Sequence, residues 1–598
     1  MPLPRVADII VDRLYRGGID TVFTVTGGGA MFLNDAMAVH PHMRTLCNHH
    51  EQACAMGAVA YAKYRNNYAA AILTTGCGST NAITGLLDAW QDNVSCIFVS
   101  GQVKRKETSH NAPVRLRQFG VQEADIISVV KSLTKYSIVL NEPKDVLYEI
   151  DKSMWIARNG RPGPVWIDVP LDVQGAVVDP ELVRAFTPPQ HASKALSLEV
   201  LNEIAQSLAA AERPVIIAGN GIRLGGACDL FTQFVEKTKI PCVVSYLGVD
   251  LLPSEHPQYV GRAGVKGDRA GNFAIQNSDY VLVLGCRLSV ALTGFEYSAF
   301  AREAHVTVVD IDPEEHSKGT VRIDSFIHAD IKAFLQGFAM PASSPHRTEW
   351  GLKCRRWRDK WPVCLPEYAH AVDGVNKYLF IERLSKYLKD DSVVVSDAGS
   401  AYYVTSQGLK IRSRQRYVTS GAQADMGFTL PAAIGVSVAG GGAEVIGITG
   451  DGSLQMNIQE LQTVVHHNLP VKLVVWNNNG YLSIRATQAK FFNGREIGTD
   501  SRSGISFPST EKIAAAYGLP FMRVSAPEEL DSALQKMMIA PGPIILEVMN
   551  PPNQEVVPTA SSARLPDGRM VSKPLEDMYP FLDREEFAAN MIVKQLDD

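Results

Sequence analysis

The sequence predicts an α/β protein built from three Rossmann-like domains, each with its own parallel β-sheet. Short apolar runs rich in β-branched residues recur along the 598 residues, and helical stretches separate them. Several of these runs end in glycine-rich turns, among them Gly27–Gly29 and Gly76–Ser79. Strands that alternate with helices form parallel sheets, and near-continuous apolar strands are usually buried on both faces.

The first block, expected at residues 1–184, contains four such runs. They are Thr21–Thr26, Ala69–Thr75, Cys96–Ser100 and Val165–Val169. A polar, proline-containing stretch at Thr187–Ser193 follows, and we expect it to be a linker. Right-handed crossovers bring the carboxyl ends of parallel strands to one edge of a sheet, where ligands bind. The glycine-rich turns after the strands are therefore candidate site loops.

Two more blocks follow the same style. The second, expected at 195–340, has strands at Pro214–Ala218, Pro241–Ser245, Tyr280–Leu284 and Val306–Asp310. The third, expected at 375–555, has strands at Ser392–Ser396, Glu444–Thr449, Val471–Trp476 and Pro543–Val548. A looser segment near Met340–Lys377 lies between them, and residues 556–598 form a tail. The similar blocks indicate duplication of one architecture, although no direct repeat can be aligned.

Composition excludes several classes of protein. Hydrophobic residues make up 46% of the chain and charged residues 20%, which are ordinary globular values. The net charge of −5 gives no electrostatic footprint for nucleic acid. Nine scattered cysteines without a CxxC pair indicate reduced thiols and a cytoplasmic location. No apolar run reaches a membrane-spanning length, so we expect no membrane partner.

A candidate phosphate and metal motif stands in the third block. Gly450-Asp451-Gly452-Ser453 follows one apolar strand, and Asn477–Gly480 follows the next. Asn478 comes 27 residues after Asp451, which leaves room for one helix and one strand, so both side chains should emerge at adjacent strand ends. Oxygen ligands and helix-start N–H groups suit Mg²⁺ with a diphosphate. Each tetrapeptide alone is also an ordinary turn; the pair favours the site.

Two further stretches carry candidate catalytic residues. His49–Ala53 (HHEQA) opens a helix rich in small residues, where Glu51 could simply complement the helix dipole. Thr419–Ala433 (TSGAQADMGFTLPAA) contains Met426, which could also be core filler.

Over nearly its whole length the chain resembles thiamine-diphosphate-dependent enzymes of the acetolactate synthase type. The stretches that carry this resemblance include GGGA, HEQA, TTGCGSTN, GRPGP, DVP, SG…MGF and the GDG and NN pair. The resemblance implies a pyrimidine-binding domain, a central nucleotide-type domain and a diphosphate-binding domain. It also implies that Asp451 and Asn478 give side-chain ligands to Mg²⁺ and that Gly480 gives a backbone carbonyl.

The same resemblance assigns the catalytic roles. Glu51 would hydrogen-bond N1′ of the cofactor's aminopyrimidine, favouring the imino form that removes the C2 proton. Such a carboxyl group should be buried. Met426 would wedge between the two cofactor rings and hold their bend. Gln122 is expected near the substrate, and His110 is a further candidate, although a lone loop histidine is usually just solvated.

Two sets of cofactor contacts are implied. For thiamine diphosphate they are Gly28, Gly76, Gly399, Ser400, Ala424, Met426, Gly450, Gly452, Ser453 and Tyr481. The central block matches where such enzymes hold FAD, at Gly219, Gly221, Leu247, Gly264, Val265, Arg287, Asp310 and Ile311. Glycines at strand ends let a dinucleotide approach the backbone. We expect a bound FAD with a structural role; a relic domain without a nucleotide is the alternative.

Some positions depart from the acetolactate synthase pattern. Leu171 stands where a lysine is usual, Thr487 where a tryptophan shapes the acceptor pocket, and Val121 where a phenylalanine precedes the retained Gln122. A basic run at 104–117 replaces the usual loop, although it could be merely solvated. The altered acceptor pocket makes the chain similar to the deoxysugar-pathway carboligases, which act on nucleotide-linked keto sugars.

The expected function is decarboxylation of pyruvate or a related 2-keto acid, followed by carboligation to a second carbonyl. The partners are then a 2-keto acid donor and a carbonyl acceptor. A homodimer or homotetramer is implied, because the family's sites lie between the first domain of one subunit and the third of another. The alternatives are a simple 2-keto acid decarboxylase, a 2-hydroxyacyl lyase or a non-catalytic subunit. Arg564–Asp567 and Lys573-Pro574 in the tail are a candidate lid, unless the tail is simply loose.

Overall fold

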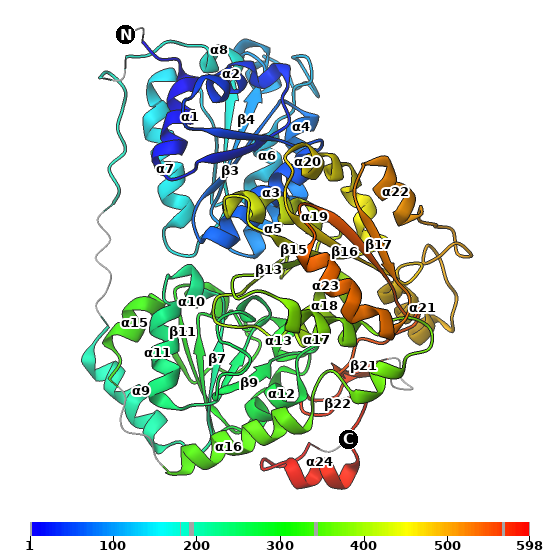
Figure 1. Ribbon diagram of the computed structural model, residues 1–598. Helices are drawn as coiled ribbons and strands as arrows, with labels where there is room; N and C mark the ends of the chain where they lie inside the picture. Colours follow the sequence, from blue (N-terminus) through cyan, green and yellow to red (C-terminus); the bar gives the residue numbers. More distant parts are fainter. Residues whose placement is uncertain (1–2, 180, 190–195, 340–344, 565–568, 597–598) are drawn as a thin grey trace.

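A computed structural model describes residues 3–179, 181–189, 196–339, 345–564 and 569–596. Three six-stranded sheets make up the molecule, and all strand pairings described within them are parallel. In Figure 1 the first block lies at the top, the central block at the lower left and the third block at the right. The predicted α/β class with three Rossmann-like domains is confirmed.

The first and third sheets have the same strand order. The first runs β2-β1-β3-β4-β6-β5 and the third β14-β13-β15-β16-β18-β17, which is 2-1-3-4-6-5 in both. The strands of the first sheet are β1 (Thr21–Thr24), β2 (Arg44–Cys47), β3 (Ala69–Leu73), β4 (Cys96–Gln102), β5 (Tyr136–Val139) and β6 (Val165–Pro170). Those of the third are β13 (Val393–Ser396), β14 (Arg416–Thr419), β15 (Val445–Gly450), β16 (Val471–Asn477), β17 (Phe521–Val524) and β18 (Ile544–Met549).

The central sheet is wound differently. Its strands are β7 (Pro214–Ala218), β8 (Cys242–Val244), β9 (Tyr259–Arg262), β10 (Tyr280–Leu284), β11 (His305–Asp310) and β12 (Ser325–His328). Their order, β12-β11-β10-β7-β8-β9, is the 3-2-1-4-5-6 order of dinucleotide-binding folds. Duplication of one architecture therefore describes the first and third blocks, whereas the central block has its own topology.

Helices cover both faces of the sheets. The first block contains α1 (Val6–Arg16), α2 (Met31–Val39), α3 (Glu51–Arg65), α4 (Cys77–Thr80), α5 (Ile83–Gln91), α6 (Ile126–Val130), α7 (Val146–Arg158) and α8 (Leu171–Gln174). The central block and the segment after it contain α9 (Leu198–Ala210), α10 (Gly221–Leu224), α11 (Cys228–Thr238), α12 (Arg269–Gln276), α13 (Val290–Thr293), α14 (Pro313–His316), α15 (Ile331–Gly337) and α16 (Pro345–Lys360). The rest are α17 (Lys377–Tyr387), α18 (Gly399–Gly408), α19 (Thr429–Ala439), α20 (Leu461–His466), α21 (Leu482–Phe492), α22 (Thr510–Ala516), α23 (Leu530–Ile539) and α24 (Arg584–Asn590).

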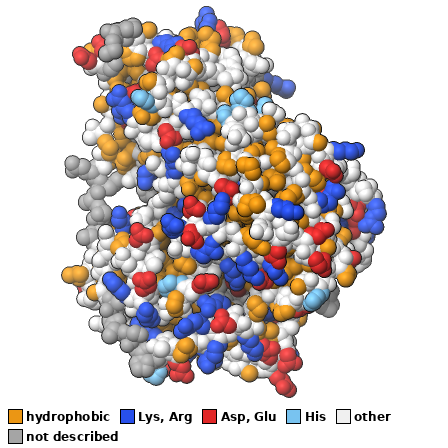
Figure 2. Space-filling model, viewed as in Figure 1, with side chains coloured by type: hydrophobic (Ala, Val, Ile, Leu, Met, Phe, Trp, Pro, Cys, Tyr) orange, Lys and Arg blue, Asp and Glu red, His pale blue; other side chains and the backbone are white. Residues whose placement is uncertain are grey.

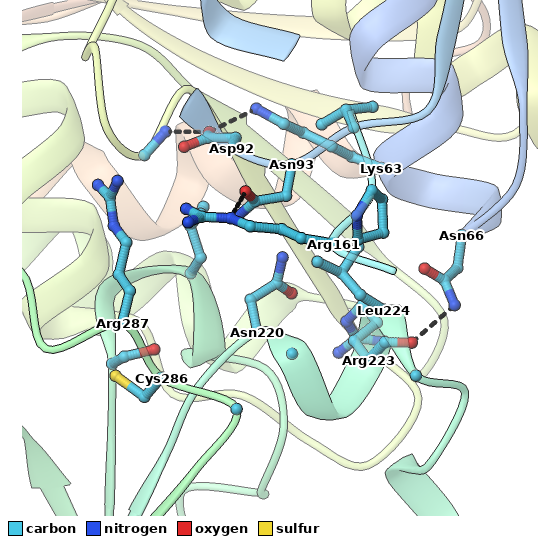
Figure 3. Close-up of a pocket in the computed structure, with 18 of the residues that line it drawn as sticks. Lys63, Asn66, Asp92, Asn93, Arg161, Asn220, Arg223, Leu224, Cys286 and Arg287 are labelled. Carbon is cyan, nitrogen blue, oxygen red and sulfur yellow. Dashed lines mark hydrogen bonds and ion pairs between the residues drawn. The ribbon is translucent and has the colours of Figure 1, made fainter. Parts of the chain in front are cut away.

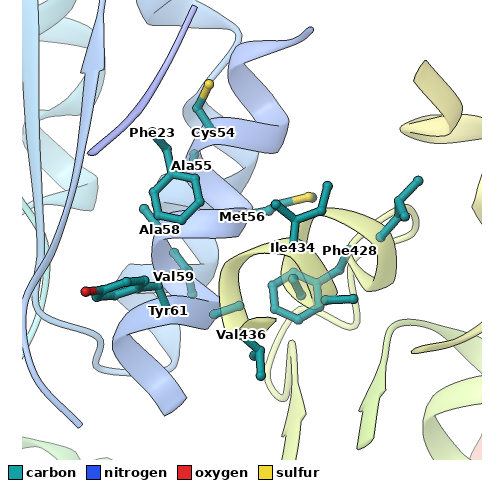
Figure 4. Close-up of a cluster of buried hydrophobic side chains, with 14 of the residues drawn as sticks. Phe23, Cys54, Ala55, Met56, Ala58, Val59, Tyr61, Phe428, Ile434 and Val436 are labelled. Atoms are coloured by element: carbon teal, nitrogen blue, oxygen red, sulfur yellow. The ribbon is translucent and has the colours of Figure 1, made fainter. Parts of the chain in front are cut away.

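Helices α3 and α19 join the first block to the third. They occupy equivalent places, each between the second and third strands of its block. A Cβ atom on Gly435 would lie 2.2 Å from the carbonyl oxygen of Gly57, so only glycine permits this crossing. Figure 4 shows Met56 of the first block beside Ile434 and Phe428 of the third, within one buried cluster. Small residues on α3 thus bring the two sheets together.

The segment after the central sheet is more ordered than the sequence indicated. Within Met340–Lys377, helix α16 buries Trp350 and Trp357 in the central core. Leu575 and Phe587 of the tail join the same cluster. The tail adds β19 (Thr559–Ala560), β20 (Ser562–Arg564), β21 (Met570–Ser572) and β22 (Met578–Tyr579).

Two sequence features fall partly outside the described residues. Of the expected linker the structure describes 187–189. Of the candidate lid it describes the backbone of Arg564 and the pair Lys573-Pro574, which lines the larger of the cavities described below. Among the described helices none is long and apolar enough to cross a membrane. Acidic and basic side chains are interspersed over the face in Figure 2, in keeping with the small net charge.

Candidate active site

The three expected metal ligands converge at the carboxyl ends of β15 and β16. The N–H of Gly480 donates to Oδ2 of Asp451 at 3.1 Å, and the N–H of Gly452 donates to Oδ1 at 2.8 Å. The side-chain amide of Asn478 lies 2.6 Å from the carbonyl oxygen of Gly480. A carboxylate, an amide and a carbonyl oxygen therefore meet at one point, which is the donor set that Mg²⁺ prefers. A cation there would face the amide oxygen of Asn478 rather than its nitrogen.

The surroundings of Asp451 suit a charged ligand. Burial raises the pKa of Asp451 to about 6, against the lowering effect of the backbone N–H donors of Gly480 and Gly452. A dication would hold this carboxyl group in its charged form. A Cβ on Gly452 would lie 2.3 Å from the Tyr481 ring, so this ring packs directly on the loop, whereas the space beside Gly450 is open.

Asp397 supports the same loop, and the sequence analysis did not identify it. Its Oδ2 accepts hydrogen bonds from Thr449 at 2.7 Å and Ser453 at 2.6 Å. Burial raises its pKa. The hydroxyl of Ser453 in turn accepts from the N–H of Gly427 at 2.8 Å. The available signal was an acid directly after an apolar strand, just before the expected contacts Gly399 and Ser400.

Met426 lies in a structured loop rather than in the core. Its side chain is half-buried and belongs to none of the described hydrophobic clusters, which disfavours a core-filling role. Two residues earlier, Ala424 has φ of 52°, the left-handed region that non-glycine residues rarely adopt. Such a conformation persists only where the surroundings fix it, and it is common at functional sites.

Glu51 begins helix α3 and is buried, with 9% of its surface exposed. The side-chain amide of Asn81 donates to its Oε2 at 2.9 Å. Its neighbour Gln52 accepts from Asn457 at 3.0 Å, and Asn457 also donates to the carbonyl of Gly427 at 3.0 Å. The start of α3, the Met426 turn and the segment after Ser453 are thus joined by hydrogen bonds.

The other catalytic candidates are placed as follows. Gln122 is exposed, with φ of 62°, and its carbonyl lies against Gly76, where a Cβ would be 2.1 Å away. A Cβ on Gly78 would lie 3.2 Å from Oε1 of Glu51, so Gln122 shares this glycine loop with Glu51. His110 is exposed in a short turn at Ser109–Asn111. Gly28 has open space beside it.

Part of the basic run is held by ion pairs. Nε of Arg105 lies 2.8 Å from Asp172, and Arg105 also donates to the carbonyl of Asn141. Lys104, Arg115 and Arg117 are exposed. Of these four basic residues, Arg105 is therefore anchored and the other three are exposed.

A cavity of about 850 Å³ lies where the three blocks meet. Of the expected nucleotide contacts, Gly221, Leu247, Arg287, Asp310 and Ile311 line it, while Gly219 packs behind them on Gly285. Gly264 and Val265 are not among its lining residues. Figure 3 shows Arg161, Arg223 and Arg287 around this cavity. Guanidinium groups and a strand-end glycine are groups that hold the diphosphate of a dinucleotide. Here Arg161 is ion-paired with Asp312 and Glu315, and Arg223 with Asp250.

A second cavity, of about 1760 Å³, opens beside the metal loop. Asn478 and Thr487 line it, with Tyr403, Lys266 and tail residues such as Tyr579. Thr487, which stands where a tryptophan is usual, therefore faces open space near the candidate metal ligand Asn478. Leu171, by contrast, starts the short helix α8 and does not line either cavity.

The candidate site residues come from two related domains, the first and the third, and lie at or near the carboxyl ends of their strands. Three family profiles match the chain: the thiamine pyrophosphate enzyme N-terminal TPP binding domain at 4–127, the central domain at 201–338, and the C-terminal TPP binding domain at 397–548. The chain is 32% identical to a probable acetolactate synthase 2 of Oryza sativa, with 93% of this chain and 84% of that protein covered. It is 31% identical to the acetolactate synthase large subunit of Lactococcus lactis, with 92% and 93% covered. The chain therefore belongs to the thiamine-diphosphate-dependent, acetolactate-synthase-like family, which confirms the resemblance seen in the sequence.

Proposed function

We propose that this enzyme decarboxylates pyruvate or a related 2-keto acid and joins the remaining acyl unit to a second carbonyl, giving an acyloin. The observation that carries the proposal is the junction of two half-sites within one hydrogen-bonded assembly. The Asp451 loop offers a metal and diphosphate site, and a buried Glu51 stands at the start of α3, the helix that packs on α19 of the third block. Both halves are needed for thiamine diphosphate chemistry, and both are present.

The residues divide the work. Thiamine diphosphate, when bound, supplies the carbon nucleophile that attacks the keto group. Asp451, Asn478 and Gly480 would hold Mg²⁺ against its diphosphate, and Gly450, Gly452 and Ser453 would offer the backbone approach. Glu51 would hold a proton at the aminopyrimidine nitrogen, with its carboxyl group oriented by Asn81. Gln122, beside the same glycine loop, would face the substrate, and Met426 would support the bend between the cofactor rings.

The remaining expectations complete the proposal. FAD would occupy the 850 Å³ cavity in a structural role, because the overall reaction involves no net redox change. The enzyme would act as a homodimer or homotetramer in the cytoplasm, where its nine cysteines, all free in the structure, would stay reduced. Any contribution of the tail as a lid would come from its strands beside the larger cavity.

The acceptor is proposed to be bulkier than pyruvate, and a keto sugar fits this description. Thr487 in place of a tryptophan leaves the 1760 Å³ cavity open beside the metal loop. Simple decarboxylation or lyase action is the second candidate. It ranks second because neither reaction needs an acceptor pocket of this size.

Product analysis tests the proposal directly. The pure protein is incubated with pyruvate, thiamine diphosphate and Mg²⁺, without and then with keto sugars and bulky ketones, and the products are identified by NMR. We expect slow release of acetaldehyde or acetoin with pyruvate alone and a new acyloin with the right acceptor. Acetolactate as the main product would contradict the bulky acceptor but keep the carboligase. Glu51→Gln should abolish turnover while thiamine diphosphate still raises the melting temperature; near-normal activity would remove Glu51 from the mechanism.

A further inference from the structure

One side chain of the first block, that of Lys63, contacts the residues on both sides of the Met426 loop, which we define as residues 420–427. Nζ of Lys63, near the end of α3, donates to the carbonyl of Thr419 at 2.9 Å, just before the loop. The same ammonium group lies 5.2 Å from the ring centre of Phe428, just after the loop. Lys63 is almost buried, with 11% of its side chain exposed. A single cation from another domain therefore touches both flanks of the Met426 loop.

Asp92 completes the grip through the loop backbone. Its Oδ2 accepts from the N–H of Gly421 at 2.7 Å and its Oδ1 from the N–H of Ala422 at 2.9 Å. Nζ of Lys63 lies 2.7 Å from Oδ2 of Asp92 and 3.1 Å from Oδ1 of Asp88, so the ammonium group binds both carboxylates. Figure 3 shows Lys63 and Asp92 pointing toward one another above the cavity between the blocks. Both side-chain oxygens of Asp92 thus accept from consecutive N–H groups near the start of the loop, those of Gly421 and Ala422.

Stability alone is a weak explanation for this cluster. Asp88 and Asp92 have no exposed surface, and burying charges costs about as much as their pairing returns. Burial raises the pKa of Asp88 well above its usual range. Although burial also opposes ionisation of Asp92, Lys63 and the N–H of Gly421 lower its pKa. The ionised pair of Lys63 and Asp92 therefore contacts the Met426 loop, which contains Ala424 in the left-handed backbone conformation.

Building on the proposed role of Met426, we propose that Lys63 and Asp92 are positioning residues, which fix the Met426 loop from across the domain boundary. They touch no reacting atom. They set the height and direction of Met426 by holding the loop backbone at residues 419, 421 and 422 and the aromatic ring at 428. The strained Ala424 conformation is what such an external constraint would maintain. The first block thereby holds the Met426 loop of its own subunit, whereas the proposed catalytic carboxylate of that block would serve a site shared with another subunit.

The test compares four variants of the full enzyme with the wild type. Asp92→Asn keeps the side-chain shape but replaces one acceptor by a donor, which then faces a backbone N–H. Lys63→Met removes the cation, and Lys63→Arg restores it. Arg65→Met is the matched control, because Arg65 also stands at the end of α3 and also donates across the boundary, to the carbonyl of Ala439 at 3.0 Å, far from the loop.

Three quantities are measured: kcat for pyruvate decarboxylation, the Kd of thiamine diphosphate with Mg²⁺, and the near-ultraviolet circular dichroism of the bound aminopyrimidine. We expect Asp92→Asn and Lys63→Met to lower kcat about 100-fold, the effect of a displacement of about 1 Å in a catalytic site, and to alter the circular dichroism. Lys63→Arg should recover most of kcat, and Arg65→Met should lower only the melting temperature.

Two outcomes would overturn the inference. One is equal loss of kcat in Lys63→Met and Arg65→Met, which would show a general packing effect. The other is an unchanged kcat and unchanged circular dichroism in Asp92→Asn, which also decides the matter if Lys63→Met does not fold. A wild-type enzyme that neither binds thiamine diphosphate nor consumes pyruvate would instead refute the proposed function, so the two failures are distinguishable.

Discussion

The first and third sheets share one strand order, yet the loops at equivalent strand ends carry different chemistry. After its third strand, the first sheet continues into Gly76-Cys77-Gly78-Ser79, and the third sheet continues into Gly450-Asp451-Gly452-Ser453. The two tetrapeptides differ in one residue. That residue is the proposed metal-binding carboxylate in the third sheet and a thiol in the first, and Mg²⁺ prefers the oxygen ligand.

The same relation holds one connection earlier in each block. Glu51 stands at the start of α3, and Met426 stands just before α19, which is the equivalent helix. These helices pack on one another at Gly57 and Gly435. The two blocks thus share a strand order and pack on one another through equivalent helices. They differ in single loop residues, which we propose make the first block the pyrimidine-binding half and the third block the diphosphate-binding half.

The largest expected effect is on turnover and comes from replacing Asp451, the residue that distinguishes the loop at 450–453 from the loop at 76–79. Asp451→Asn should lower turnover by about a thousandfold or more, because several kcal/mol of metal-based stabilisation are lost. Thiamine diphosphate with Mg²⁺ should then no longer raise the melting temperature. Cys77→Ser, at the equivalent position of the first sheet, should leave the Mg²⁺ dependence unchanged. Equal Mg²⁺ titrations for the wild type and Asp451→Asn would break the comparison.

The helix crossing gives the next largest effect, on stability. Gly435→Ala places a Cβ against the Gly57 carbonyl, and we expect a loss of about 3 kcal/mol, since neither backbone can move aside. Gly351→Ala is the matched control at a partly exposed position of helix α16, where the nearest atom to an added Cβ is 4.0 Å away. It should be neutral or stabilising by up to roughly 1 kcal/mol. Thermal denaturation of both variants tests this, and similar melting temperatures would show that the crossing tolerates a side chain.

The smallest effect concerns two carboxyl groups at the same place in β6 and β18, Asp168 and Glu547. Burial raises the pKa of Asp168 to about 7, despite hydrogen bonds from Ser100 and Gln102. Burial also opposes ionisation of Glu547, but hydrogen bonds from Thr510, Asn477 and Arg523 lower its pKa. The native state therefore holds the Asp168 proton more tightly than the unfolded chain, and the reverse is true of Glu547.

Opposite pH dependences follow for the two groups. The contribution of Asp168 to stability is complete below about pH 4 and is lost as pH rises to about 7, by roughly 1.4 kcal/mol per pKa unit at most. The contribution of Glu547 is present at neutral pH and is lost as pH falls through its lowered pKa. Denaturant midpoints of Asp168→Asn and Glu547→Gln against pH measure this. Parallel profiles for the two variants would contradict the assignment.

The sequence identified the inner part of each sheet and missed its edges. All twelve strands expected from apolar runs are present in the three six-stranded sheets. The other six strands of these sheets are their edge strands, β2, β5, β9, β12, β14 and β17. Inner strands are apolar throughout because helices cover both faces, whereas an edge strand such as Arg44–Cys47 is half-exposed and mixed in composition. Trp350 and Trp357 were not recognised as the buried face of a helix.

The candidate site shows the same limit. The Asp451, Asn478 and Gly480 set was predictable because each motif directly follows a buried strand. Asn81, Asp92 and Lys63 were not, since they act through residues that are distant in sequence, at separations of 30, 329 and 356 positions from their partners. The different order of the central sheet was also invisible, because strand runs alone carry no information on which strands are neighbours.

A crystal structure of the enzyme with thiamine diphosphate and Mn²⁺, with the anomalous signal of the metal recorded, tests the central claim most directly. The account predicts one strong peak within about 2.0–2.3 Å of oxygen atoms of Asp451, Asn478 and Gly480, the distance range of such ligands. It also predicts an aminopyrimidine ring hydrogen-bonded to a Glu51 carboxyl group. A peak elsewhere, or a cofactor bound without Glu51 contact, would contradict the division of labour between the first and third sheets.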